Sequence, residues 1–180
     1  KSEGDFTVEQ KDRNSTEKPP LNFDLTSLQR EANNMWSWAA KRTLSMAQEL
    51  YDTHKLTTYP RTDSRHLPED MMESISKTIR QLGAQDKLNP HSQRLIDDGL
   101  KNVKRNFDNS KVSDHFAIIP TGKIPPSNLS ADAAKLYDLI ARQFLASFHP
   151  ESVWKVEKRI ASKSGQNFVK EARSISTEGW

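Results

Sequence analysis

The stretch LTTYPRTDSR, residues 56–65, carries the densest group of reactive side chains in the sequence. Tyr59 and Arg61 flank the rigid Pro60, and hydroxyl, carboxylate and guanidinium groups follow directly. The β-prone residues before Tyr59 predict a short extended segment, and the proline after it disfavours a helical backbone there. Because residues two apart in an extended segment project from the same face, we expect Tyr59 and Arg61 to address one site.

These residue types suit chemistry on a phosphodiester. A tyrosine is a poor nucleophile because its phenol keeps its proton at neutral pH, but a neighbouring cation that stabilises negative charge lets it form a covalent intermediate. The guanidinium of Arg61 supplies that charge and can clamp two phosphate oxygens at once. The alternative is an ordinary surface turn in which Arg61 pairs with a carboxylate such as Asp63. Further donors suited to a nucleic-acid backbone are Thr62, Ser64 and Arg65.

Apolar residues spaced three or four apart predict helices on both sides of this stretch. Asp24 is the expected N-cap of the first helix, because its carboxylate can accept a hydrogen bond from a free amide of the first turn. Ser37 and Ser130 are expected to cap the second and the last helix in the same way. The predicted helices cover residues 25–35, 40–51, 68–83, 91–107 and 130–148.

Extended segments are predicted near both ends of the sequence and between the helices. Residues 6–10 alternate between apolar and polar side chains, and residues 111–121 form a β-prone run that includes a proline. Two more strands are expected at roughly 153–161 and 167–175, joined by a turn. The polar residues 12–24, broken by two prolines, predict a connector. The fold class is therefore α+β, with a helical block inserted into a β-rich unit.

The composition excludes several kinds of protein. The 180 residues contain no cysteine, which excludes disulfides and cysteine-ligated zinc and fits the cytoplasm. Hydrophobic residues make up 34% and charged residues 28%, and no apolar run is long enough to cross a bilayer. We therefore expect neither a secretory signal nor a membrane partner. The net charge of +3 is a mild bias toward polyanions.

Three stretches, in order along the chain, resemble the signatures of type IA DNA topoisomerases, closest to the topoisomerase III branch. Residues 56–65 resemble the active-site signature of that family. Residues 24–32, DLTSLQREA, resemble the helix that precedes the catalytic tyrosine, and residues 113–121, SDHFAIIPT, resemble the histidine motif. The resemblance covers most of the chain.

The resemblance implies an α+β fold in which a mainly helical gate domain is inserted into a β-rich arch. Residues 1–23 would be the first part of the arch, residues 24–119 the gate domain with the catalytic tyrosine, and residues 120–180 the return of the arch as a helix plus strands. Both ends of the sequence look interrupted, so we expect a piece of a larger enzyme.

The resemblance also implies roles for individual residues. Tyr59 would be the nucleophile that forms a 5′-phosphotyrosine link to a cut single strand of DNA, and resealing would need no nucleotide. Arg61 would hold the scissile phosphate, and His115 would contact it or protonate near it. Asp114 would orient the ring of His115. The sequence departs from the family at Phe116, where a second histidine or another polar residue often stands.

Contacts with single-stranded DNA are expected from residues of the three motifs. Thr26 and Ser27 share this interpretation with an explanation as helix-capping residues. The predicted DNA-binding residues are Thr58, Thr62, Asp63, Ser64, Arg65, Asp114, Gln29 and Arg30.

Members of the family carry a Toprim domain, whose clustered carboxylates bind Mg²⁺. No matching acidic motif occurs here: Asp97–Asp98 and Glu69–Asp70 lie in helical patterns and are typical of solvated faces or helix starts. The histidines show no metal-ligand spacing. We therefore expect no metal site in this chain, with Mg²⁺ bound in the full-length enzyme by the Toprim domain, which would be the chain's partner in the same polypeptide.

Two groups of side chains allow two interpretations each. Trp36 and Trp38 lie in the break between two predicted helices, where they could pack in the core or stack on bases. Lys101, Lys104 and Arg105 form a basic run that could face phosphates or solvent.

Three hypotheses describe what this chain does by itself. It could be inactive without the Toprim domain and act as a single-stranded DNA-binding module, or it could cleave DNA slowly unaided. It could instead be a structural or docking domain whose motif is a relic, but the intact set of Tyr59, Arg61 and His115 argues against that hypothesis.

Overall fold

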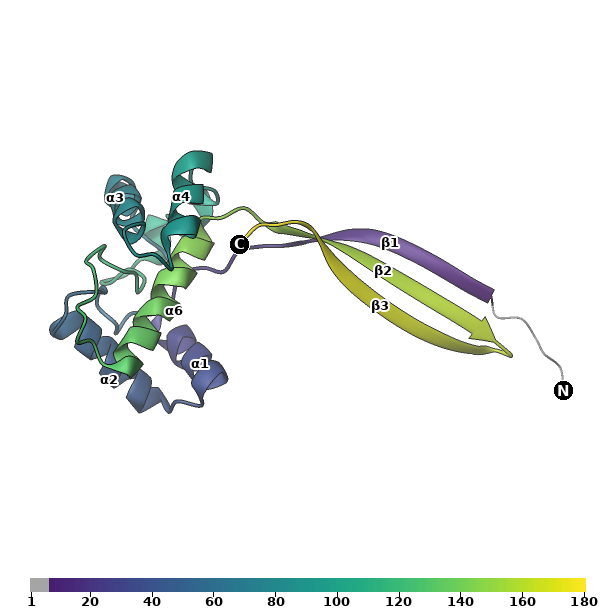
Figure 1. Cartoon of the computed structure of the whole chain (residues 1–180), viewed down its shortest axis with the longest axis horizontal. Coiled ribbons are helices and arrows are strands. Elements are labelled where there is room, and N and C mark those ends of the chain that lie inside the picture. Colours follow the sequence, from purple (N-terminus) through teal and green to yellow (C-terminus); the bar gives the residue numbers. More distant parts are fainter. Residues whose placement is uncertain (1–6) are drawn as a thin grey trace. The chain divides into compact units, whose positions relative to one another are not determined.

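The computed structural model describes residues 7–180, which divide into two compact units. Residues 20–149 form a helical unit, and the residues up to Pro19 join with 150–180 in a strand unit. Figure 1 shows the six helices and the three-stranded sheet. The predicted mixture of helices and sheet is therefore confirmed.

The strand unit is a three-stranded antiparallel sheet in the order β1-β2-β3. Its strands are β1 (Thr7–Glu17), β2 (Ser152–Lys163) and β3 (Gln166–Thr177). β2 and β3 are joined by Ser164 and Gly165, whose φ angles of 51° and 78° suit a tight two-residue hairpin turn. The two predicted C-terminal strands are confirmed, each slightly longer than expected.

The first strand differs from the sequence prediction. Phe6 lies outside the described residues, but β1 continues to Glu17 and occupies much of the predicted connector. It pairs with β2 along its whole length, and Asp12 lies 3.4 Å from the ammonium group of Lys155. Cross-strand pairing of this kind compensates for low intrinsic strand propensity, which the sequence pattern alone cannot show. The prediction that a connector starts at residue 12 is wrong.

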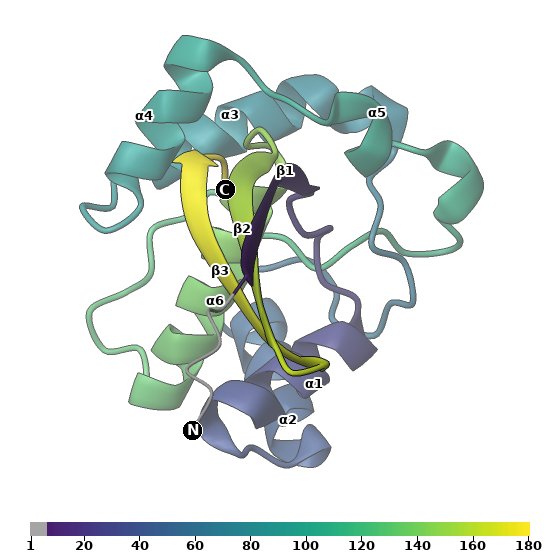
Figure 2. The ribbon, with the colours of Figure 1, turned by 90° about the vertical axis from the view of Figure 1, so that its right-hand side faces the viewer.

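The helical unit is built around α6 (Ala131–Ser147). This helix lies between two helix pairs, as the two ribbon views show (Figure 1 and Figure 2). The first pair is α1 (Leu25–Trp36) with α2 (Ala40–Asp52), and the second is α3 (Met72–Leu82) with α4 (Asn89–Asp98). The short α5 (Val103–Asn106) follows. Most of the apolar face of α6 is buried, including Leu136, Ile140 and Phe144.

The predicted caps at Asp24 and Ser130 are confirmed, but the one at Ser37 is wrong: Ser37 ends α1 with a φ angle of 57°, and α2 starts after Ala39 without a side-chain cap. The Asp24 carboxylate accepts a hydrogen bond of 2.6 Å from the Ser27 amide, and the Ser27 hydroxyl accepts one of 3.1 Å from the Asp24 amide. This reciprocal capping box fixes the start of α1. The Ser130 hydroxyl accepts a bond of 3.2 Å from the Ala133 amide at the start of α6.

One predicted helix is broken. The pattern over residues 91–107 predicts a continuous helix, but α4 ends at Asp98 and only four residues are helical again in α5. Gly99 and Asn102 have positive φ angles of 73° and 55°, which an α-helix does not contain. The Lys101 amide donates a hydrogen bond of 2.9 Å to the carbonyl of Phe148. A tertiary contact to the end of α6 therefore replaces the expected turn of helix.

The boundaries of the compact units also differ from those predicted for the domains. The segment 120–180, predicted as one return of the arch, is shared between the units: α6 belongs to the helical unit, and residues 150–180 belong to the strand unit. The reason is packing: the buried face of α6 contacts α2 and α4. The assignment of arch and gate to these segments stays a prediction.

His149 ends the helical unit in a buried position, with 4% of its surface exposed. Its carbonyl accepts a hydrogen bond of 2.7 Å from the Asn102 side chain, and its ring centre lies 6.4 Å from that of His91. Burial, together with the nearby charges of Arg94 and His91, lowers the pKa of His149 to about 4. The ring is therefore neutral in the folded protein at neutral pH.

This shifted pKa predicts a loss of stability in mild acid. Unfolded His149 takes up a proton below its ordinary pKa of 6.5, whereas the folded form resists protonation down to about 4. The free energy of unfolding should therefore fall as the pH decreases through this window, by up to about 1.4 kcal/mol per pH unit. Urea denaturation at several pH values measures this slope. The variant His149→Gln should have a shallower slope, and identical slopes would contradict the prediction.

Candidate functional site

Two extended segments, residues 56–67 and 111–121, lie side by side in the helical unit. The Thr58 amide donates a hydrogen bond of 3.0 Å to the Ile119 carbonyl, and the Thr121 amide donates one of 2.9 Å to the Leu56 carbonyl. Thr57 and Pro120 form an isolated antiparallel bridge. These bonds bring the tyrosine stretch and the histidine stretch together although about sixty residues separate them in sequence.

The start of α1 joins the same place. The Leu25 amide donates a hydrogen bond of 3.0 Å to the Thr62 carbonyl, and the Ile118 amide donates one of 2.8 Å to the Phe23 carbonyl. All three stretches singled out in the sequence are therefore linked by backbone hydrogen bonds. Their spacing in the sequence did not require this convergence.

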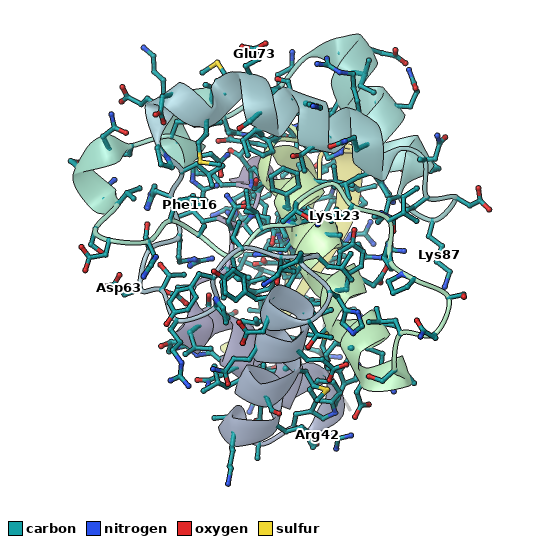
Figure 3. The ribbon with its side chains drawn as sticks, turned by 90° about the vertical axis from the view of Figure 1, so that its left-hand side faces the viewer. Arg42, Asp63, Glu73, Lys87, Phe116 and Lys123 are labelled. Carbon is teal, nitrogen blue, oxygen red and sulfur yellow. The ribbon has the colours of Figure 1, made fainter. Side chains whose placement is uncertain are left out.

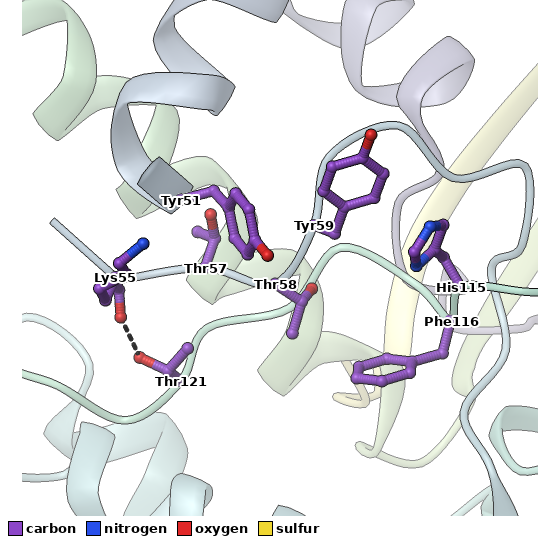
Figure 4. Close-up of a pocket in the computed structure, with 8 residues that line it drawn as sticks. All are labelled: Tyr51, Lys55, Thr57, Thr58, Tyr59, His115, Phe116 and Thr121. Carbon is purple, nitrogen blue, oxygen red and sulfur yellow. Dashed lines mark hydrogen bonds between the residues drawn. The ribbon is translucent and has the colours of Figure 1, made fainter. Parts of the chain in front are cut away.

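Tyr59 lies between two other rings. Its ring centre is 4.4 Å from that of His115 and 5.4 Å from that of Tyr51 (Figure 4). Tyr59 is half-buried and His115 is exposed. Among residues 7–180, no group forms a hydrogen bond with the Tyr59 hydroxyl. The ring contacts therefore fix the position of the Tyr59 ring, and its hydroxyl oxygen is open to a reaction partner.

Arg61 is exposed, and within the described part of the chain it forms no ion pair. Asp63, the partner that an ordinary surface turn would give it, accepts a hydrogen bond of 3.2 Å from the Ser113 hydroxyl instead. Figure 3 shows Asp63 and Phe116 on the same side of the helical unit. The Arg61 guanidinium is thus available to an anion beside Tyr59.

Most of the hydroxyl groups predicted to contact DNA have partners inside the protein. The Thr58 hydroxyl donates to the Ala117 carbonyl and accepts from the Ile119 amide, both at 2.9 Å. The Thr62 hydroxyl donates to the His115 carbonyl at 3.0 Å. The Ser64 hydroxyl donates to the Lys111 carbonyl at 2.7 Å. These side chains fix the backbone of the site, a use that the sequence did not reveal.

Arg65 also has an internal role. Its guanidinium donates hydrogen bonds of 2.8 and 3.2 Å to the carbonyls of Asn22 and Leu21. The Gln29 side chain donates one of 3.1 Å to the Ala40 carbonyl. Arg30 is exposed on α1. DNA contacts by these residues stay predictions, and only the side chain of Arg30 among the three forms no bond with another described residue.

Asp114 is exposed and forms no hydrogen bond with the ring of His115 in the described structure, so its predicted role in orienting that ring has no support here. The geometry orients His115 in another way. The Thr62 hydroxyl donates a hydrogen bond to the backbone carbonyl of His115, and the His115 ring lies against the ring of Tyr59. The contact with Tyr59 is the one that brings two predicted catalytic side chains together.

A cavity of about 350 Å³ opens beside Tyr59 (Figure 4). Six of its eight lining residues belong to the stretches 56–65 and 113–121, whereas Tyr51 comes from the end of α2 and Lys55 follows that helix, so the motifs alone did not reveal the cavity. Tyr51 lies at the end of a predicted helix, and Phe116 is the position where the sequence departs from the family. The lining residues are Tyr51, Lys55, Thr57, Thr58, Tyr59, His115, Phe116 and Thr121.

Comparisons with known proteins identify the family of the chain. A family model described as DNA topoisomerase matches residues 1–180. The chain belongs to this family. Together with the relatives named DNA topoisomerase 3 and the solved structure described next, this match confirms the predicted resemblance to type IA topoisomerases of the topoisomerase III branch.

Among curated proteins, the chain is 39% identical to DNA topoisomerase 3 of Bacillus subtilis over 165 residues, which cover 89% of the chain and 22% of that protein. It is 40% identical to DNA topoisomerase 3 of Shouchella clausii over 169 residues, which cover 92% of the chain and 23% of that protein. The chain thus spans less than a quarter of the length of these relatives.

Among solved structures, full-length topoisomerase I from Thermotoga maritima aligns with a TM-score of 0.66 over 97% of this chain and 28% of that one. The sequence identity is 23%, so this likeness concerns the fold. It agrees with the α+β architecture of the family.

Topoisomerase relatives raise the question of a metal, and the acidic residues here do not suit one. Within residues 7–180, no three histidine, aspartate or glutamate side chains gather closely enough to hold an ion. Asp98 lies 3.6 Å from Arg94, and Asp97 accepts a hydrogen bond of 2.8 Å from Gln93. Glu69 and Asp70 stand at the start of a short 3₁₀ turn. The carboxylates of Asp97 and Asp98 are therefore engaged by other side chains of α4.

The two open questions about aromatic and basic side chains are partly settled. Trp38 is buried, and the Arg42 guanidinium lies 4.7 Å from its ring, so Trp38 packs in the core. Trp36 is half-buried against Trp38. Lys101 lies outside α5, so the predicted basic run does not share one helix.

No helix of the described residues has the length and apolar character of a membrane span.

The Thr58 hydroxyl offers a test of how the site is held together. In Thr58→Val the shape is kept, but the buried Ile119 amide loses its acceptor, so the free energy of unfolding should fall by about 1–3 kcal/mol. Urea denaturation measures the change. Thr26→Val, which alters an exposed threonine of α1, should change stability by less than about 0.5 kcal/mol. Equal losses of stability in the two variants would contradict the structural role assigned to the Thr58 hydroxyl.

Proposed function

We propose that this chain is the tyrosine-bearing part of a type IA DNA topoisomerase that cuts and reseals single strands of DNA. The observation that carries the proposal is the contact between Tyr59 and His115, at 4.4 Å between ring centres, with Arg61, two residues from Tyr59, forming no ion pair with any described residue. A nucleophile and an anion-binding group on one extended segment suit attack on a phosphodiester. Family membership supports the same reaction class.

The reaction is a transesterification. The Tyr59 hydroxyl oxygen attacks the phosphorus, forming a bond between tyrosine and the 5′ phosphate while the bond from phosphorus to the 3′ oxygen breaks. The proton lost by the phenol is taken up by the departing 3′ oxygen. Because one ester replaces another, the reverse reaction reseals the strand without ATP, and passage of another strand before resealing changes DNA topology.

Two side chains assist Tyr59 in this proposal. The Arg61 guanidinium binds two non-bridging oxygens of the phosphate and stabilises the negative charge that grows on them. His115 contacts the same phosphate, because its ring lies against the nucleophile. Thr58 and Thr62 act as positioning residues through the backbone of the site.

We assign the binding of Mg²⁺, which the reaction also requires, to another part of the polypeptide. The described residues offer no carboxylate cluster for Mg²⁺, and the relatives are several times longer than this chain. We assign Mg²⁺ binding to a Toprim domain in the same polypeptide, and place the enzyme in the cytoplasm with the DNA. By itself, the chain acts as a single-stranded DNA-binding module, which the unpaired Arg61 supports.

The covalent step can be tested by transfer of label. A single-stranded oligonucleotide labelled at its 3′ end is incubated with the chain and Mg²⁺, with or without a separately prepared Toprim-containing polypeptide, and then denatured. Label should attach to the chain when the Toprim polypeptide is present, and not in Tyr59→Phe, which lacks the attacking oxygen but should still bind DNA. Undiminished label in Tyr59→Phe would exclude Tyr59 as the nucleophile.

The role of Arg61 predicts that charge alone is insufficient. Arg61→Lys keeps the positive charge but loses the two parallel hydrogen bonds, so the rate of label transfer should fall by roughly a hundred-fold or more. Arg142→Lys is the matched control, because Arg142 is an exposed arginine of α6 that pairs with Asp138 at 2.8 Å. A lysine variant at residue 61 as fast as this control would remove the guanidinium from the mechanism.

A further inference from the structure

The cavity beside Tyr59 has the size and position of a ligand site. Its volume of about 350 Å³ lies within the range of small-molecule sites. It lies entirely within the helical unit, between the segment from Tyr51 to Tyr59 and the segment from His115 to Thr121. The proposed nucleophile forms part of its wall, so a strand attached to Tyr59 begins at the cavity (Figure 4).

Aromatic rings form much of the cavity wall. Tyr51 meets Tyr59 edge to face, with 5.4 Å between ring centres and 75° between ring planes. Phe116 comes from the opposite segment, and all three rings are partly exposed. Exposed aromatic faces are the surfaces on which the bases of single-stranded nucleic acids stack. The wall therefore suits a flat heterocycle better than a sugar or a phosphate.

The Thr57 hydroxyl supplies a polar contact in the same cavity. Thr57 is 2% exposed, and its hydroxyl has no hydrogen-bond partner among the described residues. A buried hydroxyl without a partner costs about 1–3 kcal/mol, so such groups usually have a ligand, a water or a protein partner. A threonine hydroxyl can donate or accept, which lets it meet the edge of any base.

Lys55 brings a positive charge to the cavity. Its ammonium group lies 5.3 Å from the centre of the Tyr51 ring, and in the described part of the chain it forms no ion pair. Its backbone is fixed, because its carbonyl accepts a hydrogen bond of 2.8 Å from the Thr121 hydroxyl. An ammonium group here can meet a phosphate next to a base held in the cavity.

We propose that this cavity binds the base of the nucleotide whose 5′ phosphate becomes linked to Tyr59. The base stacks on the aromatic wall, its edge bonds to the Thr57 hydroxyl, and Lys55 binds the next phosphate of the strand. The inference rests on the proposed function and deepens it. The site holds the cut end in place after cleavage, while the other end is free to move.

The experiment uses ligands that imitate the cut end, so that no cleavage is needed. The chain with Tyr59→Phe is titrated with a short oligothymidylate bearing a 5′ phosphate, and with the same strand lacking its first base. Fluorescence anisotropy measures both affinities. Loss of the first base should weaken binding by roughly 5- to 100-fold, the usual effect of one stacked base, and loss of an inner base should weaken it less.

Variants assign this effect to the cavity. Added to the Tyr59→Phe chain, Phe116→Ala should abolish the difference between the two strands. Thr57→Val, which keeps the shape of the side chain, should weaken binding of the complete strand by about 5-fold and leave the shortened one unchanged. Phe168→Ala removes an exposed ring from β3 and should preserve the full difference. A 5-iodouracil at the first position should cross-link to Tyr51 or Phe116 under light.

The proposal would be overturned if the complete strand and the strand lacking its first base bound with equal affinity, or if no strand bound. It would also be overturned if Phe116→Ala weakened the binding of both strands equally, or if the cross-links formed outside the cavity. Failure of the proposed function shows itself differently, as label transfer that does not depend on Tyr59. The binding experiment contains no nucleophile, so the two failures are distinguishable.

Discussion

The backbone hydrogen bonds between residues 56–67 and 111–121 are the constraint on which the site depends. Thr58 gives this pairing three bonds, one from its amide and two through its hydroxyl. The isolated bridges of Thr57 with Pro120 and of Phe23 with Ile118 extend it to the segment before α1. These bonds hold Tyr59 and His115, which lie on separate extended segments, next to each other.

The pairing explains why a polar motif leaves so few side chains available for a ligand. Thr58, Thr62, Ser64 and Arg65 satisfy buried carbonyl and amide groups of the two segments and of the stretch before α1. Loops that carry function are often irregular, and their backbone groups need partners that sheets and helices supply elsewhere. The side chains not used in this way are the ones that the proposal assigns to chemistry.

Features of the fold that depend on residues close together in the sequence could be predicted, whereas features that depend on contacts between distant residues could not. Most helices and their caps at Asp24 and Ser130 follow from local periodicity and from hydrogen bonds within one turn. The break after α4 follows from a bond to the end of α6, and the length of β1 from pairing with a strand far away in sequence. Likewise, the cavity combines two distant segments, so no sequence pattern marked Tyr51, Lys55 or Thr57 as a group.

By itself, the sequence determined the family, the α+β class, and the presence of a tyrosine and an arginine on one extended segment, because these depend on residue types and short spacings. Only the tertiary structure decided which polar side chains hold the backbone, that Arg61 has no ion-pair partner among residues 7–180, and that α6 packs with the helices. The physical reason is that hydrogen-bond satisfaction and burial depend on every neighbour in space. A residue's type limits which bonds it can form, and the fold selects among them.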